Sequence, residues 1–173
     1  MNIAQDVDVV NNSNEKNASA TETKTVYINI AFSQLAKDIN DNLVTHQFNG
    51  KGRKIAQLSQ EQESQYIQYF SDKSGKDKLE QPFEITDGNN IDFVVQPATV
   101  NDSAASFKWQ GIMQNQYDLQ QVKGKKSTYQ AVTTLAPGTS ETDSVTIQIK
   151  FKFDGGKYYV SWDPKVIIKT PPP

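Results

Sequence analysis

The sequence of 173 residues contains no cysteine and a single histidine. The missing thiols exclude disulfides, thiolate nucleophiles and Cys-ligated zinc, and one imidazole cannot supply the nitrogen ligands that a zinc site would still need. His46 lies near the end of the first predicted helix, where imidazoles commonly interact with the last carbonyls. A structural role is therefore favoured over general-base catalysis.

Long apolar runs and an excess of either charge are also absent. No stretch approaches the ~18 apolar residues that span a bilayer, and no signal-peptide core is present. Eighteen Lys and Arg stand against twenty Asp and Glu, for a formal net charge of −2. This balance indicates no electrostatic footprint for duplex nucleic acid. The short basic runs at 51–54 and 123–126 are interpreted as solvated loops.

The sequence lacks the common catalytic and cofactor motifs as well. It has no Gly-x-Ser-x-Gly elbow, P-loop or dinucleotide fingerprint. The segment 87–90, Asp-Gly-Asn-Asn, lacks the acidic series and terminal Glu of a calcium loop. Trp109 and Trp162 could stack on a base or a sugar, but they lie on apolar strand faces, which favours core packing. We therefore expect no enzyme, no catalytic, cofactor-binding or metal-binding residues, and no cofactor.

Composition divides the chain into three parts. Residues 1–24 are rich in Asn, Ser and Thr and poor in large apolar residues, which predicts a disordered arm or linker. Residues 25–170 are predicted to form one domain, a size that suits a single core. Residues 171–173 are a Pro tail that closes the domain.

Two segments after the arm have helical periodicity. Apolar residues from Phe32 to Val44 recur at spacings of three and four, which predicts a first helix. Ser59 and Gln62 fit a capping box that opens a second helix, expected to continue past Phe70 and to end at 74–75. A short helical turn is expected around 77–81.

The period changes to two after residue 82, which predicts strands. Alternating runs lie at 83–85, 91–95, 107–119 and 129–135, followed by the last and clearest pattern at 145–162. The run at 107–119 is too long for one average strand, so a bend or bulge is expected near Gly111 or Asn115.

The segment 145–162 predicts a two-stranded hairpin that turns on Gly155-Gly156. This register pairs Phe153 with Tyr158 and places six apolar side chains on one face: Ile149, Phe151, Phe153, Tyr158, Val160 and Trp162. Helices that precede a sheet with one apolar face predict an α+β fold. In this fold, two or three N-terminal helices pack on a curved antiparallel sheet of four to six strands.

The end of this hairpin and the residues after it resemble a known family. The segment 158–168, with Trp162-Asp163-Pro164 at its centre, resembles the last strand of the nuclear transport factor 2-like cone fold. This closing segment is similar to the end of the non-catalytic N-terminal domain of some class B penicillin-binding proteins. The predicted order of helices followed by a curved sheet resembles the soluble domain of the inner-membrane assembly factor of Gram-positive conjugative type IV secretion systems. The Asn-Pro-x-Gly motif of Gram-negative assembly factors is missing, which puts their dimerisation mode in doubt for this chain.

The resemblance implies a non-catalytic structural or assembly subunit of a conjugative secretion channel. Such a domain acts through protein–protein contacts on the extracellular face of the membrane, and its anchor would be a segment absent from this chain. The implied partners are other secretion-channel proteins, with homo-oligomer formation left open and no sequence-specific nucleic acid. Two alternatives are an accessory domain of a cell-wall transpeptidase and a small-molecule-binding cone.

Overall fold

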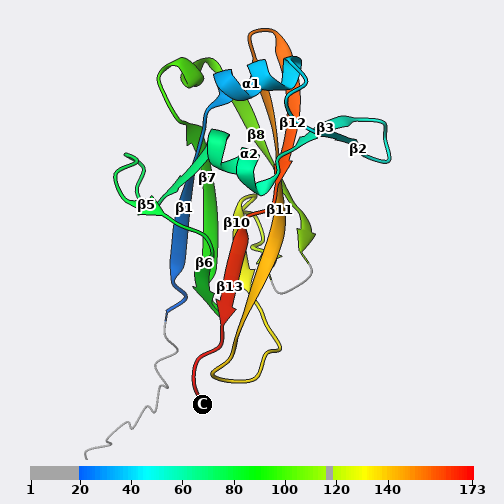
Figure 1. Ribbon diagram of the computed structural model, residues 1–173. Coiled ribbons are helices and arrows are strands. Elements are labelled where there is room, and N and C mark those ends of the chain that lie inside the picture. Colours follow the sequence, from blue (N-terminus) through cyan, green and yellow to red (C-terminus); the bar gives the residue numbers. More distant parts are fainter. Residues whose placement is uncertain (1–19, 116–118) are drawn as a thin grey trace, which may run out of the picture.

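The computed structural model describes residues 20–115 and 119–173, and this part of the chain is built mainly of strands (Figure 1). Its helices are α1 (Phe32–Asn40), α2 (Gln60–Tyr66) and the 3-10 helix η1 (Asn101–Ala104). Its strands are β1 (Thr23–Ile30), β2 (His46–Phe48), β3 (Lys54–Gln57), β4 (Ile67–Phe70), β5 (Lys78–Leu79), β6 (Phe83–Thr86), β7 (Asn90–Pro97), β8 (Ser106–Asn115), β9 (Leu119–Gln121), β10 (Thr128–Ala131), β11 (Ser140–Phe153), β12 (Gly156–Trp162) and β13 (Lys165–Lys169). Most of the predicted arm, residues 1–19, lies outside the described residues.

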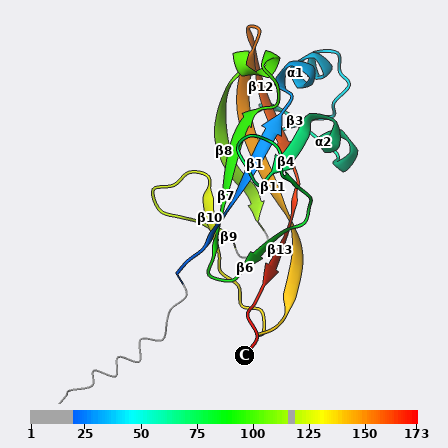
Figure 2. The same cartoon turned by 90° about the vertical axis from the view of Figure 1, so that its left-hand side faces the viewer.

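The strands form two mixed sheets. One sheet has the order β5-β4-β1-β7-β10-β9, and the other has the order β2-β3-β12-β11-β13-β6, with β8 paired to β11. Parallel pairs occur in both sheets, namely β1 with β7, β12 with β3, and β13 with β6. The two sheets run along the long axis of the molecule, and α1 sits at the end that also holds the β11–β12 turn (Figures 1 and 2).

The predicted α+β fold, with helices packed on an antiparallel sheet, is wrong. The two α-helices have nine and seven residues, too few to cover a sheet. The first reason is β1, where Val26, Ile28 and Ile30 alternate and are fully buried, so a strand precedes the first helix and begins a second sheet. The second is that α2 ends at Tyr66, because the next four residues extend as β4 and pair with β1.

The expected nuclear transport factor 2-like cone is wrong for the same reasons. A cone of that kind needs helices against one curved sheet, whereas here one sheet covers the other. The segment that suggested the resemblance is also not one closing strand. Asp163 and Pro164 separate β12 from β13, and these two strands pair with different halves of β11.

Some local predictions are confirmed. The apolar stripe of α1 is buried, and the capping box of α2 is present, with Ser59 Oγ accepting from Gln62 N at 3.2 Å and Gln62 Oε1 accepting from Ser59 N at 3.1 Å. The helical turn expected around 77–81 is instead the two-residue strand β5.

Aromatic side chains join the two sheets. Phe93 of β7 stacks on Trp109 of β8 with ring centroids 5.7 Å apart. Trp162 of β12 is fully buried and donates its indole N–H to Tyr69 Oη of β4 at 2.9 Å. The prediction of core packing is confirmed for Trp162, whereas Trp109 is partly buried and packs against the core.

The terminal hairpin is present, but its turn lies one residue earlier than predicted. Asp154 and Gly155 have φ values of 47° and 77°, so they are the central turn residues, and Phe153 pairs with Gly156. Asp-Gly suits a turn that needs positive φ at both central positions. The shift moves each partner by two positions along β12, an even number, so the apolar side chains keep their common face.

The predicted irregularity in the 107–119 run is confirmed. Gln148 of β11 pairs with Gly111 of β8, whereas the next residue, Ile149, pairs with Trp109. Gln110 is therefore an extra residue on β8, beside Gly111 with its φ of 120°. This bulge lies in the part of the sheet that forms the candidate site.

Candidate binding face

The solvent side of the β3-β12-β11-β8 part of the sheet is here called the outer face. Because strand side chains alternate, the core positions Ile149 and Phe151 place Gln148, Lys150 and Lys152 of β11 on the opposite side. The sheet thus has one side packed in the core and one side that meets solvent.

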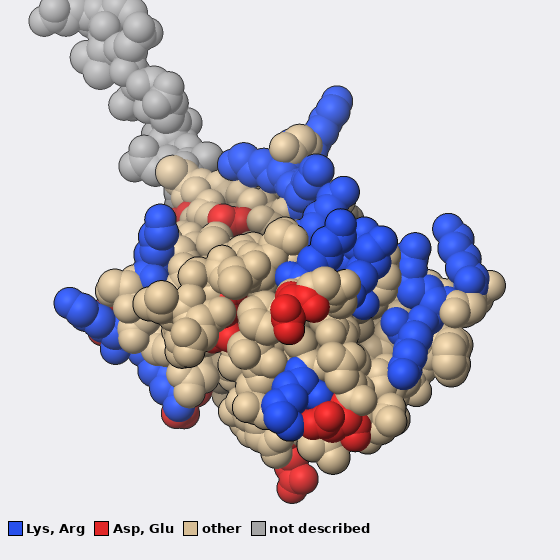
Figure 3. Space-filling view, turned by 90° about the horizontal axis from the view of Figure 1, so that it is seen from above, with Lys and Arg blue, Asp and Glu red and all other residues tan. Residues whose placement is uncertain are grey.

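Five cations gather at the turn end of the outer face, here called the cationic end: Arg53, Lys108, Lys150, Lys152 and Lys157. The register places Lys150 opposite Lys108 and Lys152 opposite Lys157. The Arg53 guanidinium lies 4.3 Å from the centroid of the Tyr159 ring, and Lys150 Nζ lies 5.7 Å from it. Seen from this end of the molecule, Lys and Arg cluster over one side (Figure 3).

None of these five cations forms an ion pair within residues 20–115 and 119–173. The ion pairs found there are Lys37–Asp41 and Lys169–Glu84, both away from the outer face. Like charges directly across a strand pair destabilise the sheet, so this arrangement has an energetic cost that no ion pair offsets. The result is a local positive potential in a chain of net charge −2.

A hollow of about 500 Å³ lies beside the cationic end on the same face. Its lining includes the amides Gln57, Gln110 and Gln148, together with Arg53 and Asp163. The lining is therefore mostly polar and uncharged, with a cation at one side and a carboxylate at another.

Two buried polar side chains of this hollow have no partner. Gln148 and Ser161 are each 7% exposed, and they stand directly opposite each other on β11 and β12. Neither side chain makes a hydrogen bond within the described part of the chain, although both line the hollow. Nearby Thr146 differs, since its Oγ1 donates to Asp163 Oδ1 at 2.6 Å.

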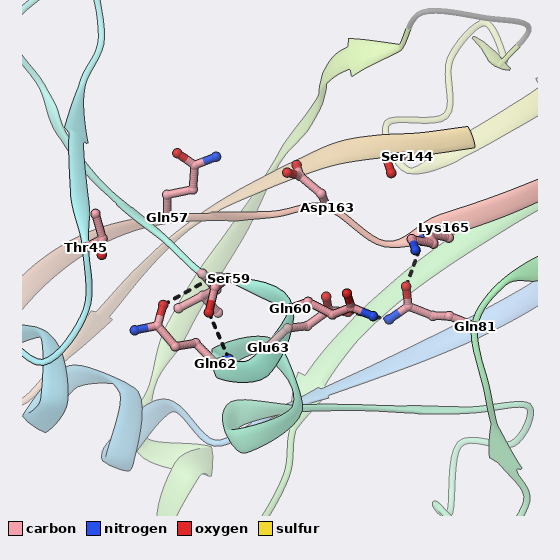
Figure 4. A pocket seen from close by; sticks show the side chains of 11 residues that line it. Thr45, Gln57, Ser59, Gln60, Gln62, Glu63, Gln81, Ser144, Asp163 and Lys165 are labelled. Atoms are coloured by element: carbon pink, nitrogen blue, oxygen red, sulfur yellow. Dashed lines mark hydrogen bonds between the residues drawn. The ribbon is translucent and has the colours of Figure 1, made fainter. Parts of the chain in front are cut away.

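A second polar pocket, of about 400 Å³, shares Gln57 and Asp163 with the hollow (Figure 4). In it Glu63 is 4% exposed and accepts hydrogen bonds from Tyr69 Oη and from Gln81 Nε2, the latter at 2.5 Å. Figure 4 shows Gln81 between Glu63 and Lys165, whose backbone N–H donates to Gln81 Oε1 at 2.8 Å.

The electrostatics of the Glu63 cluster follow from its burial. Burial raises the pKa of the Glu63 carboxyl, the hydrogen bonds from Tyr69 and Gln81 lower it, and the charge of Asp163 raises it further. A pair of carboxylates in one pocket can serve acid–base catalysis. Here, however, the Glu63 oxygens face partners from β4 and from the segment before β6, so the cluster ties elements of the fold together.

His46 does not lie at a helix end. It is in β2, beyond the last residue of α1, and its Nε2 atom is buried without a hydrogen-bond partner. Burial lowers the pKa of the imidazole, and the charge of Lys54 lowers it further. Within the described residues, no group of three His, Asp or Glu side chains is placed to hold a metal ion.

The sequence interpretation named no site residues, and it missed this face for an identifiable reason. Arg53 was assigned to a solvated loop, yet that loop brings its side chain onto the ring of Tyr159. The polar alternation of Lys150 and Lys152 was visible in the sequence. The neighbours of these lysines across the strands were not, because pairing with β8 and β3 depends on the tertiary fold.

Comparison with known proteins adds little to this geometry. No family model matches the chain, and no curated protein matches it. One solved structure that is similar is the inclusion body protein PixA from Burkholderia cenocepacia J2315, with 10% identity, 88% of this chain and 98% of that chain covered, and a TM-score of 0.45. The two mixed sheets and two short helices overturn the expected cone-fold family assignment and its keywords of type IV secretion. No helix among residues 20–115 and 119–173 has the length and apolarity needed to cross a membrane.

Proposed function

We propose that the chain is a binding protein for a polyanionic polymer, which lies across the outer face with its negative groups at the cationic end. The observation that supports this proposal is the set of five cations without ion-pair partners. They come from four separate segments of the chain: the loop before β3, and strands β8, β11 and β12.

The layout of the charges suits a polymer better than a single small anion. Lys108, Lys150 and Arg53 form one row across the strands, in which the Tyr159 ring links the last two. Lys152 and Lys157 form a second row nearer the turn. Neighbouring strands lie about 4.8 Å apart, so the first row places positive charge over a length of the order of ~10 Å, and the second row spans one strand spacing beside it.

The energetics follow from exposure. Each exposed cation contributes about 0.2–1 kcal/mol when it meets an anion, so affinity depends on several contacts made together. Salt screens contacts of this kind, so binding should weaken steeply as ionic strength rises.

The test uses heparin as the probe and the full chain. We expect the triple variant Lys108→Gln, Lys150→Gln, Lys152→Gln to bind fluorescent heparin about tenfold more weakly, as the loss of three such contacts implies. The matched control Lys76→Gln, Lys78→Gln, Lys123→Gln removes the same charge from exposed positions elsewhere and should leave the dissociation constant nearly unchanged. Equal weakening in both triple variants, or no binding by the native chain at low salt, would overturn the proposal.

The secretion-channel role expected from the sequence rested on the cone-fold resemblance, and the two-sheet fold removes that basis. The expected lack of catalysis follows from the missing motifs and stays a prediction. The expected extracellular location came from the same resemblance and is untested by the fold. Binding of a polymer through local charge is consistent with the expectation that the chain does not bind nucleic acid in a sequence-specific way.

A further inference from the structure

We infer that the hollow beside the cationic end binds a neutral, hydroxyl-bearing sugar unit, so that the polymer is an acidic polysaccharide. This inference rests on the proposed function and names its ligand class. It comes from the floor of the hollow rather than from the cations.

The floor of the hollow has hydrogen-bonding capacity that the protein itself does not use. Gln148 and Ser161 are more than nine-tenths buried and unpartnered, and together they present an amide and a hydroxyl side by side. The polar atoms of both side chains are not sealed from solvent, so water can reach them in the hollow and a ligand can displace it. A ligand that both donates and accepts hydrogen bonds would satisfy both side chains.

The walls of the hollow favour sugar hydroxyls over phosphates. Asp163 accepts hydrogen bonds only, so it attracts hydroxyl donors and repels a phosphodiester group. The amides of Gln57 and Gln110 add donors and acceptors without charge. Met113, which is 49% exposed, offers an apolar surface for the carbon-bound hydrogens of a sugar ring.

The same lining disfavours nucleobases as occupants. Single-stranded nucleic acid is held largely by bases that stack on aromatic rings. The floor is made of amide and hydroxyl groups, and Phe48, which is 72% exposed, is the one aromatic side chain of the lining. Tyr159, at the cationic end, already has the Arg53 guanidinium over its ring.

The position of the hollow links the two parts of the face. Arg53 lines the hollow and also belongs to the cationic end. A chain in which neutral and acidic sugars alternate could therefore place a neutral unit over Gln148 and its acidic neighbour against Arg53 and Lys150. The volume of about 500 Å³ lies within the range of small-molecule sites.

Hyaluronan oligosaccharide, in which neutral and acidic sugars alternate, is the probe for the test, and polyphosphate and a thymidine oligonucleotide are the comparison polyanions. We expect Gln148→Leu to bind hyaluronan about tenfold more weakly, as loss of a hydrogen-bonded amide implies, and to bind polyphosphate as the native chain does. The control is Gln120→Leu, which removes an exposed amide on β9 and should change the affinity for neither hyaluronan nor polyphosphate. Thermal unfolding of each variant establishes that it is folded.

The outcomes separate this inference from the proposed function. The inference would be overturned if Gln148→Leu bound hyaluronan as the native chain does. It would also be overturned if the native chain bound the oligonucleotide or polyphosphate more tightly than hyaluronan. In either case the triple Lys variant still tests the cationic end. If the triple Lys variant has no effect but the side-chain NH2 signal of Gln148 shifts on titration with cellohexaose, the hollow binds sugar and the polyanion proposal fails. If neither hyaluronan nor cellohexaose shifts that signal, the inference fails.

Discussion

Two groups of buried polar side chains differ in their hydrogen-bond partners. In the pocket beside α2, Glu63 is 4% exposed and accepts hydrogen bonds from Tyr69 and Gln81. On the outer face, the side chains of Gln148 and Ser161 are 7% exposed and form none in the described part of the chain. Burial is thus nearly equal, and the difference lies in the partners, which indicates that the first group stabilises the fold and the second is available to a ligand.

The origin of the partners explains this difference. Glu63 is reached by side chains from two other segments, Tyr69 of β4 and Gln81 before β6, and Tyr69 in turn accepts from Trp162 of β12. Gln148 and Ser161 stand on neighbouring strands whose backbones are already paired, and the side chains that surround them form no hydrogen bond with them. Their polar atoms face the hollow, where solvent or a ligand can reach them.

The largest effect is expected from Glu63→Ala. This change leaves the buried Tyr69 hydroxyl and the Gln81 amide without their acceptor, and we expect the free energy of unfolding to fall by about 2–3 kcal/mol. Urea unfolding measures it. As a control, Glu61→Ala, on the exposed side of α2, should change stability by less than ~0.5 kcal/mol. An equally small loss for Glu63→Ala would show that the cluster does not hold the elements together.

The second prediction concerns pH and the variant Glu63→Gln. Burial raises the folded-state pKa of Glu63 above its ordinary value of 4.5, so between the two values the folded state binds more protons than the unfolded state. The contribution of Glu63 to stability therefore falls as pH rises through the folded-state pKa. Glu63→Gln, which cannot ionise, should lose this component, so native stability should decline relative to the variant as pH rises. Unfolding curves from about pH 4 to pH 8 test this, and a constant difference would contradict it.

A smaller effect is expected from Gln148→Leu on stability. The amide makes no hydrogen bond in the described part of the chain, so its loss breaks none and adds apolar contact. We expect a change of less than about 1 kcal/mol, in either direction. Calorimetry in the absence of ligand measures it. A loss as large as that of Glu63→Ala would remove the distinction between the two groups.

The smallest effect is expected from Lys157→Glu at the cationic end. This change converts a like-charged cross-strand pair with Lys152 into an opposite-charged pair, and we expect a gain of about 0.2–1 kcal/mol. The gain should shrink in high salt, which screens exposed charges. Lys157→Gln should give a smaller gain, and a loss of stability in both variants would mean that the two side chains do not repel each other.

Local features of the fold were open to prediction because they depend on near neighbours. The Ser59–Gln62 capping box and the buried stripe of α1 involve residues within one or two turns. The strand alternation that separates Lys150 from Phe151 has the same local origin. The turn of the hairpin was misplaced by one residue, because the prediction used Gly155-Gly156 and did not consider that Asp154 adopts positive φ.

The fold class was not predictable by the same means. Tyr66, Ile67 and Phe70 lie at helical spacings, yet the helix stops at Tyr66 since pairing with β1 draws the next residues into a strand. That pairing joins segments far apart along the chain, and no local pattern encodes it. Because the sequence analysis did not predict β1, it also did not predict a second sheet.

The sequence by itself determined which side chains of β11 and β12 share a face, because alternation along a strand and a short turn are local properties. It also determined that Trp162 lies on the buried side. Only the tertiary structure decided that Arg53 would reach Tyr159, and that Gln148 and Ser161 would be buried without partners. The physical reason is that satisfaction of a buried polar group depends on which distant side chains reach it, and those around Gln148 and Ser161 form no hydrogen bond with them.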